Sequence, residues 1–238
     1  MDELTKTAHT STQRSPQGII VLVDVLLFTL VNGTLSVLLH KRPAEPFAGA
    51  LALPGGYVRP QEDKTTLAAA KRVLKQKIGV DAPYLEQLKT YSGSDRDPGG
   101  WSVSVAYFAL IAREEAEAAD QTGVWKAVDG ALRLAFDHRT MVADAVERIR
   151  NKSAYSSLPA FLAGPVFTLG QLQKIYESVL GVPLEKVTFR RRIEEIGAIE
   201  AVEGAMVTGR RSRPAQLYRI KPEHRSTLGI MARGFNGR

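Results

Sequence analysis

Cysteine is absent from the 238 residues of the sequence. Without it the chain can form no disulfide, no zinc–thiolate site and no thiol nucleophile. Histidine is also scarce, and no two of its four copies stand at the spacing of a metal-ligand pair: His9, His40, His138 and His224. These two scarcities favour a protein that has no resident metal ion and no thiol chemistry.

Long apolar segments are missing as well. The apolar run Ile19–Val31 is too short to span a bilayer and contains Asp24, so a buried strand is the better interpretation. Residues 1–17 are polar and lack the apolar core of a signal peptide. We therefore expect a flexible N-terminus over residues 1–17, no membrane partner and a cytoplasmic location.

Charge is ordinary in amount but uneven along the chain, whose net charge is +7. Residues 160–238 carry 13 Lys and Arg against 7 Asp and Glu, whereas residues 1–159 carry 19 against 18. Concentrated positive charge is typical of a nucleic-acid-binding surface, although a solvated basic face without a partner has the same composition. The last third of the chain is therefore the candidate for binding nucleic acid.

Residues 18–152 show the alternation of strands and helices of a single domain. A strand over 19–30 is continuous in Val, Leu and Ile, as in a strand buried on both faces, and Asn32-Gly33 predicts a tight hairpin turn after it. Pro54-Gly55-Gly56 predicts a further turn. Strands are expected over 85–91 and 102–111, with the loop 92–100 between them and a helix over 141–150.

A helix is expected over residues 65–78, where Leu67, Ala70, Leu74 and Ile78 form one apolar stripe and Gly79 supplies the stop. With the strands on either side, this pattern predicts an α+β protein whose first domain is an α/β/α sandwich. The composition shift rich in Ser, Pro and Gly predicts a linker over residues 153–166.

Residues 167–238 follow a different pattern. Thr168 and Gln171 form a capping box that starts one helix, the break at 181–183 ends it, and a second helix runs over 184–196. Strands expected over 199–202 and 216–220 then flank a basic loop over 209–214. Helix, turn, helix and a hairpin with a basic tip is the order of a winged helix-turn-helix.

The segment 53–58, with Glu62 after it, resembles the opening of the Nudix box, whose family hydrolyses nucleoside diphosphates linked to another moiety. That motif continues on a helix as Arg-Glu-apolar-x-Glu-Glu-x-Gly, and here the matching stretch runs from Arg72 to Gly79. The three glutamate positions hold Val73, Gln76 and Lys77 instead. The spacing from Glu62 to Arg72 is also about two residues longer than the family pattern.

These replacements have a direct chemical meaning. At about 3.6 residues per turn, positions 73, 76 and 77 share an arc of roughly 100°, away from the apolar stripe, where three carboxylates could hold Mg²⁺. Val73 has no donor atom, Gln76 is a neutral ligand and Lys77 repels a cation. Pyrophosphate hydrolysis needs the metal, so we predict no enzyme and no required cofactor. The alternative is a Nudix hydrolase of ADP-ribose-like nucleotides with non-standard catalytic residues.

The first domain could still bind a nucleotide. Four cations at strand ends or in loops suit phosphate oxygens: Lys41, Arg42, Arg59 and Arg96. Tyr107 could stack on a base, as could Tyr91 and Trp101, and His138 could contact the ligand. For each one the alternative is an ordinary surface cation or a core aromatic, and for His138 a surface histidine beside a capping Asp137.

In the second domain, the helix over 184–196 carries the sharper pattern. Phe189, Ile193 and Ile196 define its buried face, Arg191 points nearly opposite, and Thr188 lies close to that exposed side. Arginine reads guanine in the major groove, while flanking cations contact phosphates. The predicted DNA-binding residues are Lys186, Thr188, Arg190, Arg191 and Arg192 on the helix, with Arg210, Arg211 and Arg213 in the basic loop. The alternative is an amphipathic helix with a solvated basic face.

Taken together, the two halves resemble the NrtR-type Nudix-related transcriptional regulators nearly end to end. The residues that carry this resemblance are 53–56 with the altered helix, 85–88, 96–98, 104–110, 134–138 and 189–191. The resemblance implies a homodimeric repressor of genes for NAD synthesis or salvage that binds a palindromic DNA operator. It also implies release by ADP-ribose or a related nucleotide. Gly99 stands where the family's loop often has arginine. An architectural or RNA-binding protein that acts independently of a small molecule is a further alternative. RNA readers usually show aromatic stacking platforms, but Tyr176 and Tyr218 fall at core positions.

Overall fold

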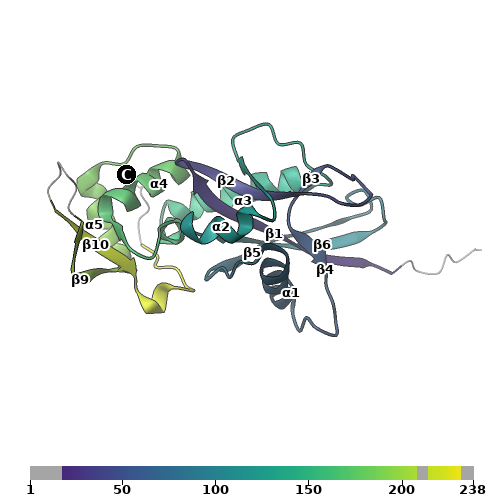
Figure 1. The fold of residues 1–238 in the computed structure, drawn as a ribbon, viewed down its shortest axis with the longest axis horizontal. Coiled ribbons are helices and arrows are strands. Elements are labelled where there is room, and N and C mark those ends of the chain that lie inside the picture. The colour runs from purple at the N-terminus through teal and green to yellow at the C-terminus, as the bar shows by residue number, and fades with distance from the viewer. Residues whose placement is uncertain (1–17, 208–213, 232–238) are drawn as a thin grey trace, which may run out of the picture.

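The computed structural model describes residues 18–207 and 214–231, so the N-terminal segment expected to be flexible lies outside the described residues. The chain forms an elongated body in which two domains follow one another along the long axis (Figure 1). No helix in the described part of the chain is long and apolar enough to cross a membrane.

The first domain is built on a mixed sheet with β1 (Ile20–Val31) at its centre. β1 forms the predicted hairpin with β2 (Thr34–Lys41) through Asn32 and Gly33, both at positive φ, and pairs in parallel with β6 (Ser102–Leu110). β5 (Leu85–Gly93) extends the sheet beyond β6. The short strands are β3 (Leu51–Ala52) and β7 (Val124–Ala127), which pair with β2, and β4 (Gly55–Tyr57), which pairs with β1.

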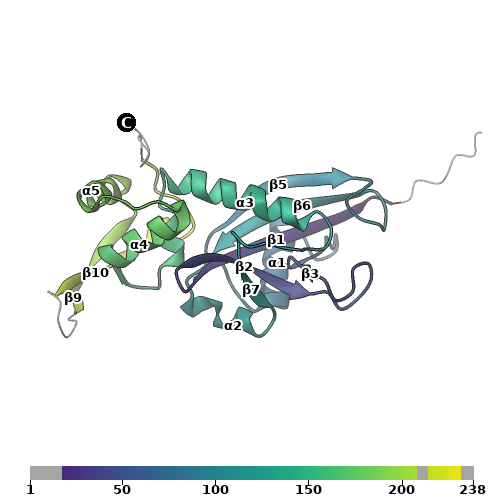
Figure 2. The same ribbon diagram turned by 90° about the horizontal axis from the view of Figure 1, so that it is seen from above.

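Each face of this sheet is covered by a helix. Leu26 and Phe28 of β1 pack in the cluster that contains α3 (His138–Ser153), whereas Val25 and Leu27 pack in the cluster that contains α1 (Thr66–Val73). Both faces of β1 are therefore buried, which confirms the interpretation of its continuous apolar run. Figure 2 shows α3 lying over the sheet and running along the long axis toward the second domain. The predicted α/β/α sandwich is confirmed.

Helix α1 differs from the expected helix over 65–78. Thr65 caps it by accepting the Ala68 N–H, but the α-helix ends at Val73 and continues as a π-helical turn η1 (Leu74–Ile78). Ala70, Leu74 and Ile78 are buried as expected, whereas Leu67 is exposed and Val73, expected away from the stripe, is fully buried. Both differences lie in α1, before the π turn, where the face that packs against the sheet is formed by Ala69, Ala70 and Val73. Gly79 ends the segment at φ 78°, as predicted.

Gly55 and Gly56 do not form the turn that their sequence suggested, because they lie in strand β4. Gly55 stands opposite Asp24 of β1, and a Cβ added to it would lie 2.1 Å from the Asp24 Oδ1 atom. This close approach of two strands beside a buried carboxylate accepts only glycine.

Two segments join the first domain to the second. Two single-turn elements, η2 (Glu114–Ala116) and α2 (Glu117–Asp120), precede α3 in the chain. Helix α3 spans 16 residues and extends three residues beyond each end of the helix expected over 141–150. The connection over 153–166 contains the 3-10 helix η3 (Leu158–Leu162), which is buried throughout. Leu158 and Phe161 pack in the core of the first domain, and Ala160 packs in the core of the second. The connection is thus part of both cores rather than an exposed tether.

The second domain consists of β8 (Phe167–Thr168), α4 (Leu169–Leu180), α5 (Lys186–Ile196), β9 (Ile199–Val207), β10 (Ala215–Ile220) and η4 (Pro222–His224). The capping box of Thr168 and Gln171 is present, and Gly181 and Gly197 end the two helices in the left-handed conformation. The strands form a small sheet in the order β8-β10-β9. Helix, turn, helix and hairpin therefore occur in the predicted order.

Candidate functional site

An open cavity of about 360 Å³ lies in the first domain, where β4 pairs with β1. Its walls come from β1, the end of β2 with the loop that follows, β4, η1, the loop before β6 and the N-terminus of α3. Residues far apart in the sequence meet here. The side chains that matter below are Asp24, His40, Arg42, Lys77, Arg96, Phe136 and His138.

The floor of the cavity is built around the buried carboxylate of Asp24. Its Oδ2 atom accepts a hydrogen bond from the Ser104 hydroxyl at 2.6 Å. His138 accepts the Leu53 N–H at Nδ1, 3.0 Å away, so its ring proton resides on Nε2, which lies 3.7 Å from Asp24 Oδ1. Burial lowers the pKa of His138, so the ring is neutral at neutral pH. This floor is polar, and the orientation of each of its groups is fixed.

Arg96 is held beside this floor by a second carboxylate. Its guanidinium donates to both oxygens of Asp137, at 3.0 and 3.1 Å, and to the Ser102 hydroxyl at 3.0 Å. One of the two alternatives for this segment had Asp137 as a helix cap, but its side chain accepts no capping hydrogen bond and pairs with Arg96 instead. Arg96 therefore orders the loop before β6 while its positive charge is neutralised.

The cation at the mouth of the cavity is Arg42. Its guanidinium carbon lies 4.6 Å from the centroid of the Phe136 ring, and its Nε donates to the Pro46 carbonyl at 2.7 Å. Phe47 packs edge-on against the same ring. Since cation–π contacts leave guanidinium donors accessible, Arg42 can offer N–H groups to an anion.

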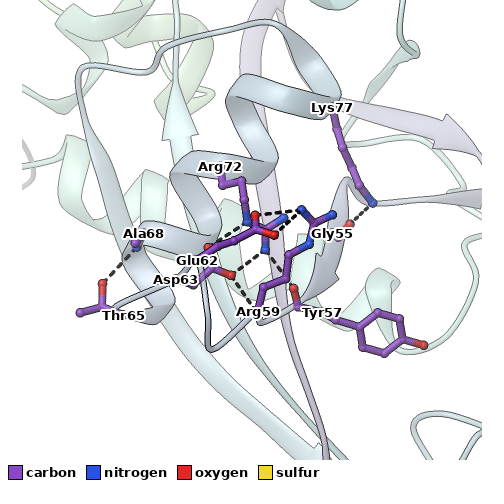
Figure 3. A network of polar contacts seen from close by, with 9 residues as sticks. All are labelled: Gly55, Tyr57, Arg59, Glu62, Asp63, Thr65, Ala68, Arg72 and Lys77. Carbon is purple, nitrogen blue, oxygen red and sulfur yellow. Dashed lines mark hydrogen bonds and ion pairs between the residues drawn. The ribbon is translucent and has the colours of Figure 1, made fainter.

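The altered Nudix helix anchors a separate ionic network (Figure 3). Arg72 donates to both carboxylate oxygens of Asp63, at 2.7 and 2.8 Å, and to the Tyr57 carbonyl at 3.0 Å. Hydrogen bonding from Arg72 lowers the pKa of Asp63 to about 2. Glu62, the expected Nudix residue, pairs instead with Arg59 at 3.0 Å in the exposed loop. The retained arginine thus has a structural role in holding the segment 57–63 against α1.

The three positions that hold glutamate in the Nudix motif do not suit a divalent metal ion. Val73 is fully buried in the core, Gln76 is exposed, and the Lys77 ammonium donates to the Gly55 carbonyl. Within residues 18–207 and 214–231, no group of three or more His, Asp or Glu side chains could hold a metal ion. The donor atoms present are a cation and a neutral amide, where Mg²⁺ prefers anionic oxygens.

The structure gathers only some of the residues predicted to bind an effector. Arg42, Arg96 and His138 line the cavity, whereas Lys41 lines an adjoining hollow together with His40 and Lys77. Arg59 lies outside, paired with Glu62, and Tyr107 lies in the core, where its hydroxyl bonds to Thr66 at 2.8 Å. Among the cavity residues that sequence reasoning missed are Asp24, His40, Lys77 as a lining residue, and Phe136. Asp24 was visible only as a charge within an apolar run.

The exposed face of α5 is basic, as expected. Phe189, Ile193 and Ile196 are buried against α4 and the small sheet, which confirms the predicted apolar face. The exposed side carries Lys186, Arg190 and Arg191, none of which has an acidic partner within the described part of the chain, with Thr188 and Arg192 half-buried beside it. Val187, 73% exposed on this side, was missed. Arg210, Arg211 and Arg213 lie outside the described residues.

A sandwich domain with an open cavity, joined to a winged helix-turn-helix with an exposed basic helix, defines a class of two-domain transcriptional regulators. Residues 21–145 match the family described as the NUDIX domain, and residues 159–220 match the NrtR DNA-binding winged helix domain. The "ADPR responsive transcriptional repressor NtrR" of Acinetobacter baylyi is 42% identical over 206 residues, which cover 84% of this chain and 82% of the relative.

Two solved structures extend the likeness. Shewanella oneidensis NrtR complexed with a 27mer DNA matches with a TM-score of 0.83 at 36% identity, covering 90% of this chain and 98% of that chain. The NUDIX domain of Shewanella oneidensis NrtR complexed with ADP ribose matches with a TM-score of 0.51 at 33% identity, covering 57% and 94%. The chain therefore belongs to the NrtR-type family of Nudix-related transcriptional regulators.

Proposed function

We propose that this chain is a repressor that binds a palindromic DNA operator as a homodimer and is released by ADP-ribose or a related nucleotide. The observation that carries this proposal is that a ligand-sized cavity and an exposed basic helix lie in separate domains of one chain. Among the residues that the structure describes, the cavity of the first domain has no metal-ligand set, and Lys186, Arg190 and Arg191 of α5 in the second domain are exposed without an acidic partner. The family resemblance further supports genes of NAD synthesis or salvage as the targets.

On the DNA side, α5 enters the major groove. Arg191 and Thr188 face the base edges, and Lys186, Arg190 and Arg192 contact the phosphates that flank them. The basic loop with Arg210, Arg211 and Arg213 serves as the wing. In a dimer, the two recognition helices stand about 34 Å apart, one turn of DNA, which is why a palindromic site is expected.

On the effector side, Arg42 supplies a cation at the mouth of the cavity, and Lys41 supplies another in the adjoining hollow. His138 and the paired Arg96 shape the floor of the cavity. We leave Arg59 and Tyr107 out of the effector site, because the first pairs with Glu62 outside the cavity and the second is buried in the core.

Helix α3 offers a physical link between the two sites. It begins at His138 on the cavity floor and ends at Ser153, next to the buried connection. On the far side of that connection, the Tyr176 hydroxyl of α4 donates to the Ser156 carbonyl at 2.9 Å, and Val179 packs in the first core. A ligand releases DNA only if it binds the DNA-incompatible arrangement more tightly. We propose that the two arrangements differ by a small shift of α3.

The test starts from random double-stranded DNA, from which the full chain selects its preferred sequence. We expect a palindromic consensus, and we expect ADP-ribose, but not AMP at equal concentration, to weaken binding to it. Selection that yields no consensus would reject the DNA-binding proposal. An affinity for the selected DNA that is unchanged in millimolar ADP-ribose would reject the effector.

We also infer that the chain does not hydrolyse ADP-ribose, because Val73, Gln76 and Lys77 replace the carboxylates that the metal-dependent reaction needs. Incubation with ADP-ribose and Mg²⁺, followed by chromatography for AMP, tests this inference. Release of AMP at a rate proportional to protein concentration would instead support the alternative, a hydrolase with non-standard catalytic residues.

A further inference from the structure

We propose that Lys77 is a built-in cation that binds the pyrophosphate of ADP-ribose in place of a divalent metal ion, so that effector binding is independent of metal. This inference rests on the proposed function, since it assigns a role to one residue within the same effector cavity. It also explains why a residue that repels metal ions stands at a former ligand position.

The geometry places the Lys77 ammonium at the cavity. Lys77 lies in the π-helical turn η1, from which its side chain crosses to β4 and donates to the Gly55 carbonyl (Figure 3). A Cβ added to Gly56 would lie 3.6 Å from its Nζ atom, so the ammonium rests over two glycines. An ammonium group has three donors. With one of them on Gly55, two are available to phosphate oxygens.

Charge distinguishes Lys77 from the other cation on the cavity floor. The charge of Arg96 is neutralised by its two hydrogen bonds to Asp137, whereas Lys77 has no carboxylate partner within the described residues. Partial burial lowers the pKa of Lys77, and the nearby Arg72 and Arg59 lower it further. These cations repel one another, and a bound phosphate would relieve that repulsion.

The same surroundings disfavour a divalent ion at this point. A metal ion beside Gly55 would meet the Lys77 ammonium and the field of Arg72 and Arg59. The carboxylates that line the cavity are Asp24, Glu45 and Asp97. Asp24 already accepts the Ser104 hydroxyl and Asp97 the Gly99 N–H, and in the described part of the chain no three acidic or histidine side chains are grouped so as to hold a metal ion. The cavity therefore does not provide the set of anionic oxygens that Mg²⁺ requires.

Calorimetry of ADP-ribose binding to the full chain tests this inference, with each protein titrated in EDTA and in MgCl₂. The wild type should bind with the same Kd in both buffers. Lys77→Met should bind about 10-fold or more weakly in both, because the charge-assisted hydrogen bonds are lost. Lys77→Glu should bind more weakly still in both buffers, because its carboxylate repels the pyrophosphate and does not by itself complete the set of anionic oxygens that Mg²⁺ requires.

Lys75→Met is the matched control, because Lys75 lies on the same turn but pairs with Asp81 on the exposed side and lines no part of the cavity. Its Kd should equal that of the wild type. Thermal unfolding of each variant checks folding. If Lys77→Met did not fold, Lys77→Gln would replace it, and the wild-type comparison in the two buffers would still decide.

The outcomes distinguish the role of Lys77 from the identity of the effector. A wild type whose affinity falls more than about fivefold in EDTA would overturn the role of Lys77 while leaving ADP-ribose as the effector. Lys77→Met binding as tightly as the wild type would overturn it as well. If the wild type bound ADP-ribose in neither buffer, the proposed effector itself would be rejected.

Discussion

Arginine serves two different purposes in the two domains of this chain. In the first domain Arg72, Arg96 and Arg113 each hold an aspartate through two hydrogen bonds. On α5 of the second domain, Arg190 and Arg191 face outward without an acidic partner in the part of the chain that the structure describes. A paired arginine orders the backbone around it, whereas an exposed, unpaired one remains available to phosphates and bases.

This contrast has opposite consequences for stability and for binding. Removing one member of a buried ion pair strands the other in a medium that solvates it poorly, so the folded state loses free energy. Removing an exposed cation costs the folded state little but removes a contact from the complex with an anionic partner. A variant of a paired arginine should therefore change the free energy of unfolding, and a variant of an exposed arginine on α5 should change the affinity for DNA. The expected effects are taken from the largest to the smallest.

The largest effect is expected for Arg96→Ala. The Arg96 side chain is 8% exposed and neutralises Asp137 near the buried Asp24, so its loss leaves two carboxylates close together without compensation. We expect the free energy of unfolding of the first domain to fall by about 3 kcal/mol. Urea denaturation followed by tryptophan fluorescence measures this, because both tryptophans, Trp101 and Trp125, lie in that domain.

Lys75→Met is the control for this prediction as well, since its ion pair with Asp81 is exposed on both sides. The control should change the unfolding free energy by no more than about 0.5 kcal/mol. If the two variants were equally stable, the pairing of Arg96 would not be what distinguishes the first domain from the second.

A smaller effect, confined to binding, is expected for Arg191→Ala. The affinity for the selected DNA should fall by roughly 10- to 100-fold, because one base contact is lost, while the unfolding free energy should stay within about 0.5 kcal/mol of the wild type. Fluorescence anisotropy with a labelled duplex measures the affinity.

Lys64→Ala removes an exposed cation of the first domain and should leave that affinity unchanged. An Arg191→Ala protein that binds the selected DNA as tightly as the wild type would mean that α5 is not the recognition helix.

The second domain could be predicted from the sequence more fully than the first. Its helices are bounded by local signals, the capping box of Thr168 and the glycines at 181 and 197, and a single period places Phe189 and Ile193 on the buried side. Such signals act within a few residues of one another. Tertiary contacts do not alter them, so the ends of both helices and the buried face of α5 were readable, although α5 begins at Lys186 instead of 184 and β9 extends to Val207 instead of 202.

The cavity of the first domain could not be read in this way, because it depends on contacts between distant segments. The pairing of Gly55 with Asp24 arises only when β4 lies beside β1, and the pairing of Arg96 with Asp137 joins residues 41 positions apart. The π-helical turn after Val73 also changes the helical period within one segment. The sequence indicated which carboxylates were missing, but not that Lys77 would reach Gly55.

The smallest effect concerns Asp63, the partner of Arg72, and it appears only in acid. Hydrogen bonding lowers the pKa of Asp63 to about 2, so the pair stabilises the folded state above about pH 4, where the unfolded carboxyl is ionised. That stabilisation is lost as the pH falls toward 2, because the folded state must then take up the proton. The difference in Tm between the wild type and Asp63→Asn should therefore be constant near neutral pH and narrow in acid.

Thermal unfolding followed by tryptophan fluorescence across this pH range measures the narrowing. Asp81→Asn is the control, since it removes an exposed aspartate on the same side of the sheet and leaves the pair of Arg72 intact. Its Tm difference from the wild type should stay small at every pH. A gap between the wild type and Asp63→Asn that stayed constant down to about pH 2 would mean that Arg72 does not hold an ionised Asp63. The first domain would then lose one of the paired arginines that set it apart from α5.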